Sequence, residues 1–326
     1  MILVTGSAGH LGEALMRQLR AAGRPALGID IKPSPFTDRV GSIADCVFVH
    51  AAMQGVTAVL HAATLHKPHV ATHSQQDFVD TNITGTLALL EAALAEQVGA
   101  FIFTSTTSTF GAALNPALGE PAAWIDETVT PIPKNIYGVT KLAAEGLCEL
   151  HWRRDKLPVI VLRTSRFFPE EDDDAAMRTR YPVENVQANE LLYRRVEIAD
   201  VVGAHLVALD KAPVLGFGRY IISATTPFGL EDLAALGRDA AAVVERLYPG
   251  CGALYAARGW SLFPTVDRVY VNALARRELG WRSRYDFAGV LDALRAGQDF
   301  RSPLAHAVGS KGYHAEIFAE GPYPVR

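Results

Sequence analysis

The sequence predicts an α/β protein built on a doubly wound parallel sheet, with a smaller C-terminal lobe. Runs that are apolar throughout alternate with amphipathic helical segments in the first half, which is typical of parallel strands buried on both faces. A glycine-rich turn joins the first apolar run to the first helix. The length of 326 residues suffices for about two domains. We expect a first domain over residues 1–165 and a lobe mainly over residues 166–326, with an exchange of segments between them left open.

The first half reads as strands and helices in turn. Residues 2–4 form the first expected strand, and the helix after it carries Leu11, Leu15 and Leu19 on one face. Later strands are expected at residues 25–30, 56–62, 100–104 and 159–162, and helices at residues 75–96 and 137–153.

Beyond residue 165 the alternation is less regular. The acidic run PEEDDD at residues 169–174 is expected to be a loop. Helices are expected near residues 200–209, 230–248 and 272–279, with a strand at residues 220–223 that could be shared with the first sheet. The final segment, residues 302–326, is rich in glycine, proline and aromatic residues, and we expect it to lie over the surface or over a second subunit.

The composition indicates a globular protein without a nucleic-acid or membrane partner. Apolar residues make up 49% and charged residues 20%, and the net charge of −4 supplies no basic field for a nucleic acid. No run approaches the ~20 apolar residues of a membrane span, and the first residues resemble a strand rather than a signal peptide. The three cysteines are far apart, which fits a reducing compartment, so we expect a cytoplasmic protein.

The turn TGSAGHLG at residues 5–12 is the first candidate binding site. Gly6, Gly9 and Gly12 allow a tight backbone and a close approach of a pyrophosphate. The helix N-terminus around His10 and Leu11 offers free N–H groups and a positive dipole end to phosphates. We therefore expect the turn to bind a dinucleotide. A glycine-rich turn without a ligand is the alternative.

Asp30 ends the second expected strand and favours NAD over NADP. Its carboxylate can accept hydrogen bonds from the ribose hydroxyls of NAD and would repel the 2′-phosphate of NADP. Lys32 and Arg39 follow closely in the sequence and would suit that phosphate, so NADP stays an alternative. The other residues expected in the cofactor site are Ser42, Ile43, Ala62, Ala63, Thr64 and Asn82.

Tyr137 and Lys141 are the candidate catalytic residues, because a spacing of four places them on one helix face. A free tyrosine has a pKa near 10. A neighbouring ammonium group and a positive nicotinamide ring favour the phenolate, which can exchange a proton with a substrate hydroxyl or carbonyl. Lys141 would also bind the cofactor ribose. A hydroxyl from residues 104–107 would orient the reacting oxygen. Such Tyr–Lys pairs also occur on exposed helices without a catalytic role.

These motifs, in this order, resemble the extended short-chain dehydrogenases/reductases, the group that contains nucleotide-sugar epimerases and dehydratases. Besides the glycine turn and the YxxxK pair, the similar segments are HAA at 61–63, NITGT at 82–86, STTSTFG at 105–111, LR at 162–163 and ELGW at 278–281. The resemblance implies a Rossmann fold, NAD as the cofactor, a substrate-binding C-terminal lobe, and Thr106 rather than Ser105 as the catalytic hydroxyl. It also implies a homodimer that forms through two helices.

Departures from the family pattern narrow the expected chemistry. Thr107 and Ser108 stand where the sugar dehydratases of this group have an Asp–Glu pair, so elimination of water is disfavoured. Arg166 stands where many members have an asparagine, and a cation there would suit a substrate carboxylate or phosphate. An ion pair between Arg166 and the acidic run at 169–174 is the equal alternative.

The remaining candidates concern the substrate pocket. His66 and Thr107 are expected to line it together with Arg166. Arg194 and Arg195 are shifted from the position of the family's arginine, so whether the substrate carries a nucleotide stays open. The histidines at 61, 66, 69 and 73 are too irregularly spaced for a metal site, and no metal is predicted.

The leading hypothesis is an NAD-dependent epimerase or dehydrogenase that acts on a sugar, nucleotide sugar or sugar acid. Tyr137 would remove the hydroxyl proton, Thr106 would orient the oxygen, and Lys141 would support the tyrosinate. The rival hypothesis is a non-catalytic, dinucleotide-sensing regulatory protein on the same fold.

Overall fold

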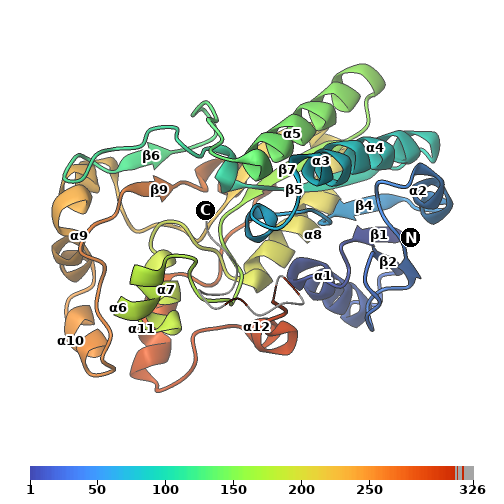
Figure 1. Ribbon diagram of the computed structural model, residues 1–326. Coiled ribbons are helices and arrows are strands. Elements are labelled where there is room, and N and C mark those ends of the chain that lie inside the picture. The colour runs from blue at the N-terminus through green and yellow to red at the C-terminus, as the bar shows by residue number, and fades with distance from the viewer. Residues whose placement is uncertain (313, 315–317, 319–326) are drawn as a thin grey trace.

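The computed structural model describes residues 1–312, 314 and 318, and it contains a seven-stranded parallel sheet. The strands lie in the order β3-β2-β1-β4-β5-β7-β8, and β1, β2, β4, β5 and β7 of this sheet are labelled in Figure 1. They are β1 (Ile2–Thr5), β2 (Ala26–Asp30), β3 (Arg39–Val40), β4 (Ala58–His61), β5 (Ala100–Thr106), β7 (Val159–Thr164) and β8 (Phe217–Ile222). The predicted doubly wound sheet is confirmed, and its strand order reverses beside β1, where such sheets bind ligands.

Helices cover both faces of this sheet, and β1 shows how the sequence separates them. Leu3 lies in the core formed with α2 (Cys46–Met53), α4 (Gly85–Ala95) and α5 (Ile136–Asp155). Val4 lies in the core formed with α1 (His10–Ala21) and α8 (Ile198–Leu215). Successive strand residues point to opposite faces, so a run that is apolar at every position requires helices on both sides.

The helix expected at residues 75–96 is divided into three parts. It consists of α3 (Gln75–Phe78), a π-helical segment (Val79–Thr84) and α4. A π-helical turn inserts an extra residue and often occurs at functional sites. Here it carries Asn82, which is buried and faces the loop after β4. Hydrophobic periodicity does not reveal such a turn, because the residues on either side remain helical.

The second half of the chain contributes to both parts of the molecule. Although α8 and β8 follow residue 165, they pack into the main sheet. The lobe has its own hydrophobic core. Its elements are α6 (Ala175–Arg180), α7 (Val183–Glu190), α9 (Leu233–Leu247), α10 (Cys251–Ala256), α11 (Phe287–Arg295) and a two-stranded parallel sheet of β6 (Ala123–Ile125) and β9 (Arg268–Tyr270). We still propose that most of the first domain precedes residue 166 and that most of the lobe follows residue 165.

The last helix, α12 (Pro303–Val308), packs against α1 and α8. The sequence predicted a surface or subunit contact for residues 302–326, and residues 313, 315–317 and 319–326 of that segment lie outside the described residues. Within the described part of the chain, every helix is too short or too polar to cross a bilayer.

Candidate functional site

A cleft of about 1730 Å³ lies between the carboxyl ends of the sheet strands and the lobe. The sheet side contributes Asp30 at the end of β2 and Thr106 at the end of β5, and the lobe contributes Arg194 and Tyr270. The predicted site residues that line it are Gly6, Gly9, His10, Leu11, Gly12, Asp30, Ser42, Ile43, Ala62, Ala63, Thr64, His66, Thr106, Thr107, Tyr137 and Arg166. The two other predicted residues, Asn82 and Lys141, are buried behind the lining.

The backbone of the glycine turn leaves no room for side chains. A Cβ atom on Gly6, whose φ is +72°, would lie 2.8 Å from the Ala63 nitrogen. A Cβ atom on Gly12 would lie 1.9 Å from the Gly6 carbonyl oxygen, so this glycine allows α1 to pack against the turn. Gly9 provides no side-chain cap for α1. The first N–H groups of the helix are therefore left for a ligand, and the turn fits the pyrophosphate of a dinucleotide.

The Asp30 carboxylate lies beside the turn in a position that suits the adenosine ribose. One of its oxygens accepts the Ala8 N–H at 3.0 Å and the other accepts the Lys32 N–H at 2.9 Å. Of the two cations that could meet a 2′-phosphate, Lys32 lines the cleft, whereas the Arg39 guanidinium donates to the Ala51 carbonyl oxygen. The Asp30 carboxylate is thus held in place beside the glycine turn, and its contact with the adenosine ribose stays a prediction.

The HAA and NITGT segments hold the loop after β4. His61 is buried between the hydroxyls of Thr5 at 2.8 Å and Thr86 at 3.0 Å, and burial lowers its pKa well below the usual value. Asn82 accepts from the Leu65 N–H and from the Thr64 hydroxyl, both at 2.9 Å. His61 therefore orders the core, and Asn82 shapes the wall of the cleft from behind. Direct contact between Asn82 and the cofactor stays a prediction.

Tyr137 and Thr106 meet on the sheet side of the cleft. The Asn135 side chain caps α5 by accepting the Gly138 N–H at 3.0 Å, and this cap places Tyr137 in the first turn of the helix. Burial raises the pKa of Tyr137 to about 12, and the nearby Thr106 hydroxyl opposes this shift in part. That Lys141 and a bound nicotinamide ring favour the phenolate stays a prediction.

The Lys141 ammonium group lies beneath the cleft, 3.9 Å from the centre of the Phe103 ring. Burial lowers the pKa of Lys141 to about 7, while the nearby Glu145 carboxylate opposes this shift. His61 of β4 also faces the ammonium group. The shared helix face predicted for Tyr137 and Lys141 is present, since both side chains are buried on α5.

Glu145 is a structural residue of the site that the sequence analysis missed. It lies one turn after Lys141 on α5 and is fully buried. Its carboxylate accepts the Ser105 hydroxyl at 2.6 Å and forms an ion pair with Arg163 at 2.7 Å. Glu145 therefore ties the catalytic helix to β5, next to Thr106, and to β7. A glutamate four residues after the lysine was the available signal, because i and i+4 share a helix face.

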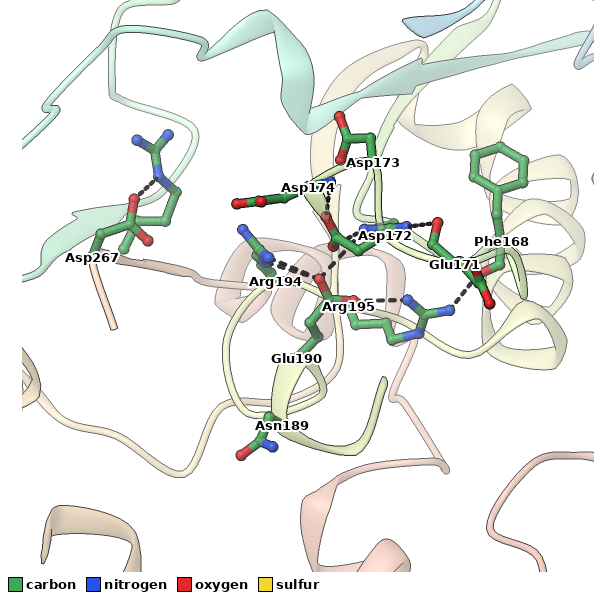
Figure 2. Close-up of polar contacts among 12 residues, drawn as sticks. Phe168, Glu171, Asp172, Asp173, Asp174, Asn189, Glu190, Arg194, Arg195 and Asp267 are labelled. Carbon is green, nitrogen blue, oxygen red and sulfur yellow. Dashed lines mark hydrogen bonds and ion pairs between the residues drawn. The ribbon is translucent and has the colours of Figure 1, made fainter. Parts of the chain in front are cut away.

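The lobe side of the cleft contains a dense group of ion pairs (Figure 2). Glu190 is fully buried and pairs with Arg194 at 2.9 Å and with Arg195 at 2.8 Å. The Arg166 guanidinium pairs with Asp172 at 2.6 Å and donates to the Glu171 carbonyl oxygen at 3.0 Å. The pairing of Arg166 with the acidic run, which was the alternative interpretation, is thus present. Contact between Arg166 and a substrate stays a prediction.

His66 lines the cleft between the two parts of the molecule. Its ring stacks on Phe168 with centroids 5.2 Å apart and lies 6.5 Å from the Tyr137 ring. Burial, followed by the charges of His69 and His10, lowers its pKa well below the usual value, so the ring is neutral near pH 7. Within the described residues, no group of three or more His, Cys, Asp or Glu side chains has an arrangement that could hold a metal ion.

Comparisons with known proteins identify the family and the fold of the chain. The model of the NAD dependent epimerase/dehydratase family matches residues 2–215. A UDP-glucose 4-epimerase of Rhizobium meliloti is 30% identical over 171 residues, which covers 50% of each chain. A dTDP-glucose 4,6-dehydratase of Streptomyces antibioticus is 29% identical over 325 residues, which covers 88% of this chain and 89% of that relative.

The matched proteins differ in how much of their length this chain covers. The chain spans about half the length of several curated relatives that it matches, between 39% and 55% for three of them. Among solved structures, a short-chain dehydrogenase/reductase superfamily protein of Agrobacterium tumefaciens with bound NAD has a TM-score of 0.65 at 24% identity, covering 94% of this chain and 99% of that one. At this identity the structural match establishes the fold.

Proposed function

Since this chain belongs to the NAD-dependent epimerase/dehydratase family, we propose that it is an epimerase or dehydrogenase that uses Thr106, Tyr137 and Lys141 on a sugar-type substrate. NAD is the cofactor of the family, as the sequence predicted. The observation that carries the proposal is that Thr106 and Tyr137 line the same cleft as the glycine turn.

Thr106, Tyr137 and Lys141 have different roles in the proposed reaction. Bound NAD supplies a hydride acceptor and a positive ring charge. Thr106 holds the substrate oxygen by a hydrogen bond, and Tyr137 accepts the hydroxyl proton at its Oη atom. Because burial holds the pKa of Tyr137 at about 12 in the protein itself, positive charge must stabilise the phenolate during the reaction. Lys141, directly below on α5, provides part of that charge while it is protonated.

The size and charge of the cleft favour a substrate that carries an anionic group. A volume of about 1730 Å³ exceeds the roughly 300–1,000 Å³ of most ligand sites, so a second ligand fits beside a dinucleotide. Arg178, Arg194 and Arg268 line the lobe end beside Asp172, Glu190 and Asp267, and an anionic substrate group would compete with these carboxylates for the guanidinium groups. We therefore propose a nucleotide sugar or sugar acid, with Arg166, His66 and Thr107 as further substrate contacts. Thr107 and Ser108 still disfavour dehydration, although a dehydratase is among the relatives.

The experiment that tests this proposal is incubation of the NAD-loaded protein with a panel of UDP-sugars, dTDP-sugars and uronic acids. Steady accumulation of reduced nicotinamide absorbance identifies a dehydrogenase, whereas a sugar product without net reduced cofactor identifies an epimerase. A 4-keto-6-deoxy product would contradict our exclusion of dehydration. Bound NAD without any turnover across the panel would overturn the catalytic proposal and favour the dinucleotide-sensing protein.

A homodimer through α4 and α5 is the oligomeric state that we propose. Both helices carry apolar side chains at the surface, since Leu94 is 36%, Val139 49% and Leu150 47% exposed. Light scattering after gel filtration would distinguish this dimer from a monomer, and Leu150→Glu is expected to shift the protein toward the monomer.

NAD is expected to bind at least about tenfold more tightly than NADP, a difference of ~1.4 kcal/mol. The reason is the fixed Asp30 carboxylate, which would lie against the 2′-phosphate. Titration of the protein with each dinucleotide measures the ratio. Asp30→Ala should reduce it, and Lys32→Ala serves as the control from the same loop. Equal affinities in the wild type would show that Lys32 outweighs Asp30.

A further inference from the structure

Residues 310–312 and 314, here called the strap, contact Glu170, His10 and Pro68 beside the cleft. The Ser310 hydroxyl and the Lys311 N–H donate to the Glu170 carboxylate at 2.9 and 3.1 Å. The Lys311 N–H also lies 3.2 Å from the His10 ring nitrogen, at the start of α1. The His314 ring nitrogen lies 3.0 Å from the Pro68 carbonyl oxygen. Lys311 and Gly312 line the cleft together with Gly9 and His10.

The strap also places a cation on a carboxylate that would oppose phosphate binding. Glu13 lies in the first turn of α1, directly after Gly12, and is 6% exposed. A carboxylate there competes with a pyrophosphate for the positive end of the helix dipole, and its negative charge repels the phosphates. The Lys311 ammonium group pairs with Glu13 at 2.5 Å, and Arg17 pairs with the other carboxylate oxygen at 2.8 Å.

We propose that the strap is the outer wall of the NAD site, and that Lys311 makes this site suitable for a pyrophosphate by neutralising Glu13. The inference rests on the NAD binding that the proposed function requires, and it adds residues from the opposite end of the chain to the cofactor site. Glu170 has a supporting role, because it pairs with His10 at 2.7 Å while it holds the strap backbone.

A double-mutant cycle on Glu13 and Lys311 tests the charge relation directly. The dissociation constant of NAD is measured by titration calorimetry for the wild type, Lys311→Ala, Glu13→Gln and the double variant. Lys311→Ala is expected to weaken NAD binding about tenfold, since Arg17 alone then opposes the Glu13 charge. Glu13→Gln should bind NAD at least as tightly as the wild type. The double variant should return to within about threefold of the wild type, because both charges are removed.

Lys211→Ala is the matched control, since Lys211 is an exposed lysine on α8 outside the cleft lining and its loss changes the net charge equally. Hydrogen exchange adds a readout for the wall itself, because bound NAD should slow exchange of the amides at residues 310–312. If the wild type binds NAD but Lys311→Ala equals Lys211→Ala, or if the double variant is no tighter than Lys311→Ala, the inference is wrong. Failure of the wild type to bind NAD would overturn the proposed function as well.

Discussion

Replacement of Tyr137 by phenylalanine is expected to reduce turnover roughly 10²-fold or more while NAD binding is retained. The change removes one hydroxyl, and with it the group that would take the substrate proton. The Tyr137 ring is buried on α5, and a phenylalanine ring of the same shape should keep its packing. Single-turnover kinetics on an identified substrate, with the NAD dissociation constant measured in parallel, separates the loss of chemistry from any loss of binding.

Variants of Thr106 and Lys141 separate the three proposed roles. Thr106→Ala should have a milder effect than Tyr137→Phe, because it removes orientation of the substrate oxygen but leaves the proton acceptor. Lys141→Ala should lower turnover and weaken NAD binding together, because the ammonium group supports the tyrosinate and is expected to bind the cofactor ribose. Near-normal turnover of Tyr137→Phe would show that another residue is the acid/base group.

Glu145→Ala is expected to destabilise the protein by about 3–5 kcal/mol, the usual cost of removing one partner of a buried ion pair. The Glu145 side chain is fully buried and that of Arg163 is only 5% exposed, so the variant leaves the Arg163 charge in the interior without this carboxylate. The Ser105 hydroxyl loses its acceptor at the same time. Urea unfolding followed by circular dichroism measures the difference in the free energy of unfolding.

Glu149→Ala provides the control from the next turn of the same helix. Its side chain is 23% exposed and pairs with Arg153 and Arg219 at the surface, so its loss should cost no more than about 1 kcal/mol. Similar losses for the two variants would mean that the buried network contributes little. The milder Ser105→Ala variant removes one hydrogen bond from Glu145 without leaving a charge unpaired, and it keeps the comparison available if Glu145→Ala does not fold.

Local hydrophobic patterns in the sequence predicted most of the strands and helices on the sheet side of the cleft. The first predicted helix, with its leucines four residues apart, is α1, and the apolar runs at residues 100–104 and 159–162 are parts of β5 and β7. The strand at residues 220–223 joins the main sheet as part of β8. The short strands β3, β6 and β9 were missed, because two or three residues carry no periodicity.

For the candidate catalytic residues, the sequence predicted the helix face but not the degree of burial. The spacing of Tyr137 and Lys141 predicted a shared helix face, and both side chains are buried on α5. Burial raises the pKa of Tyr137 to about 12 in the protein without NAD, so the phenolate that the motif predicts depends on positive charge from NAD and Lys141. The degree of burial depends on elements distant in the sequence, and a motif of five residues does not contain that information.

The sequence by itself determined the alternation of strands and helices, the glycine turn and the acidic residue at the end of β2. These features follow from side-chain periodicity and backbone conformation over a few residues. Only the tertiary structure decided which charges meet. Arg166 pairs with Asp172 instead of facing the cleft unpaired, and Lys311 reaches Glu13 at the other end of the chain. An ion pair depends on a separation of a few ångströms in space, and that separation is set by how the sheet, the lobe and the strap pack together.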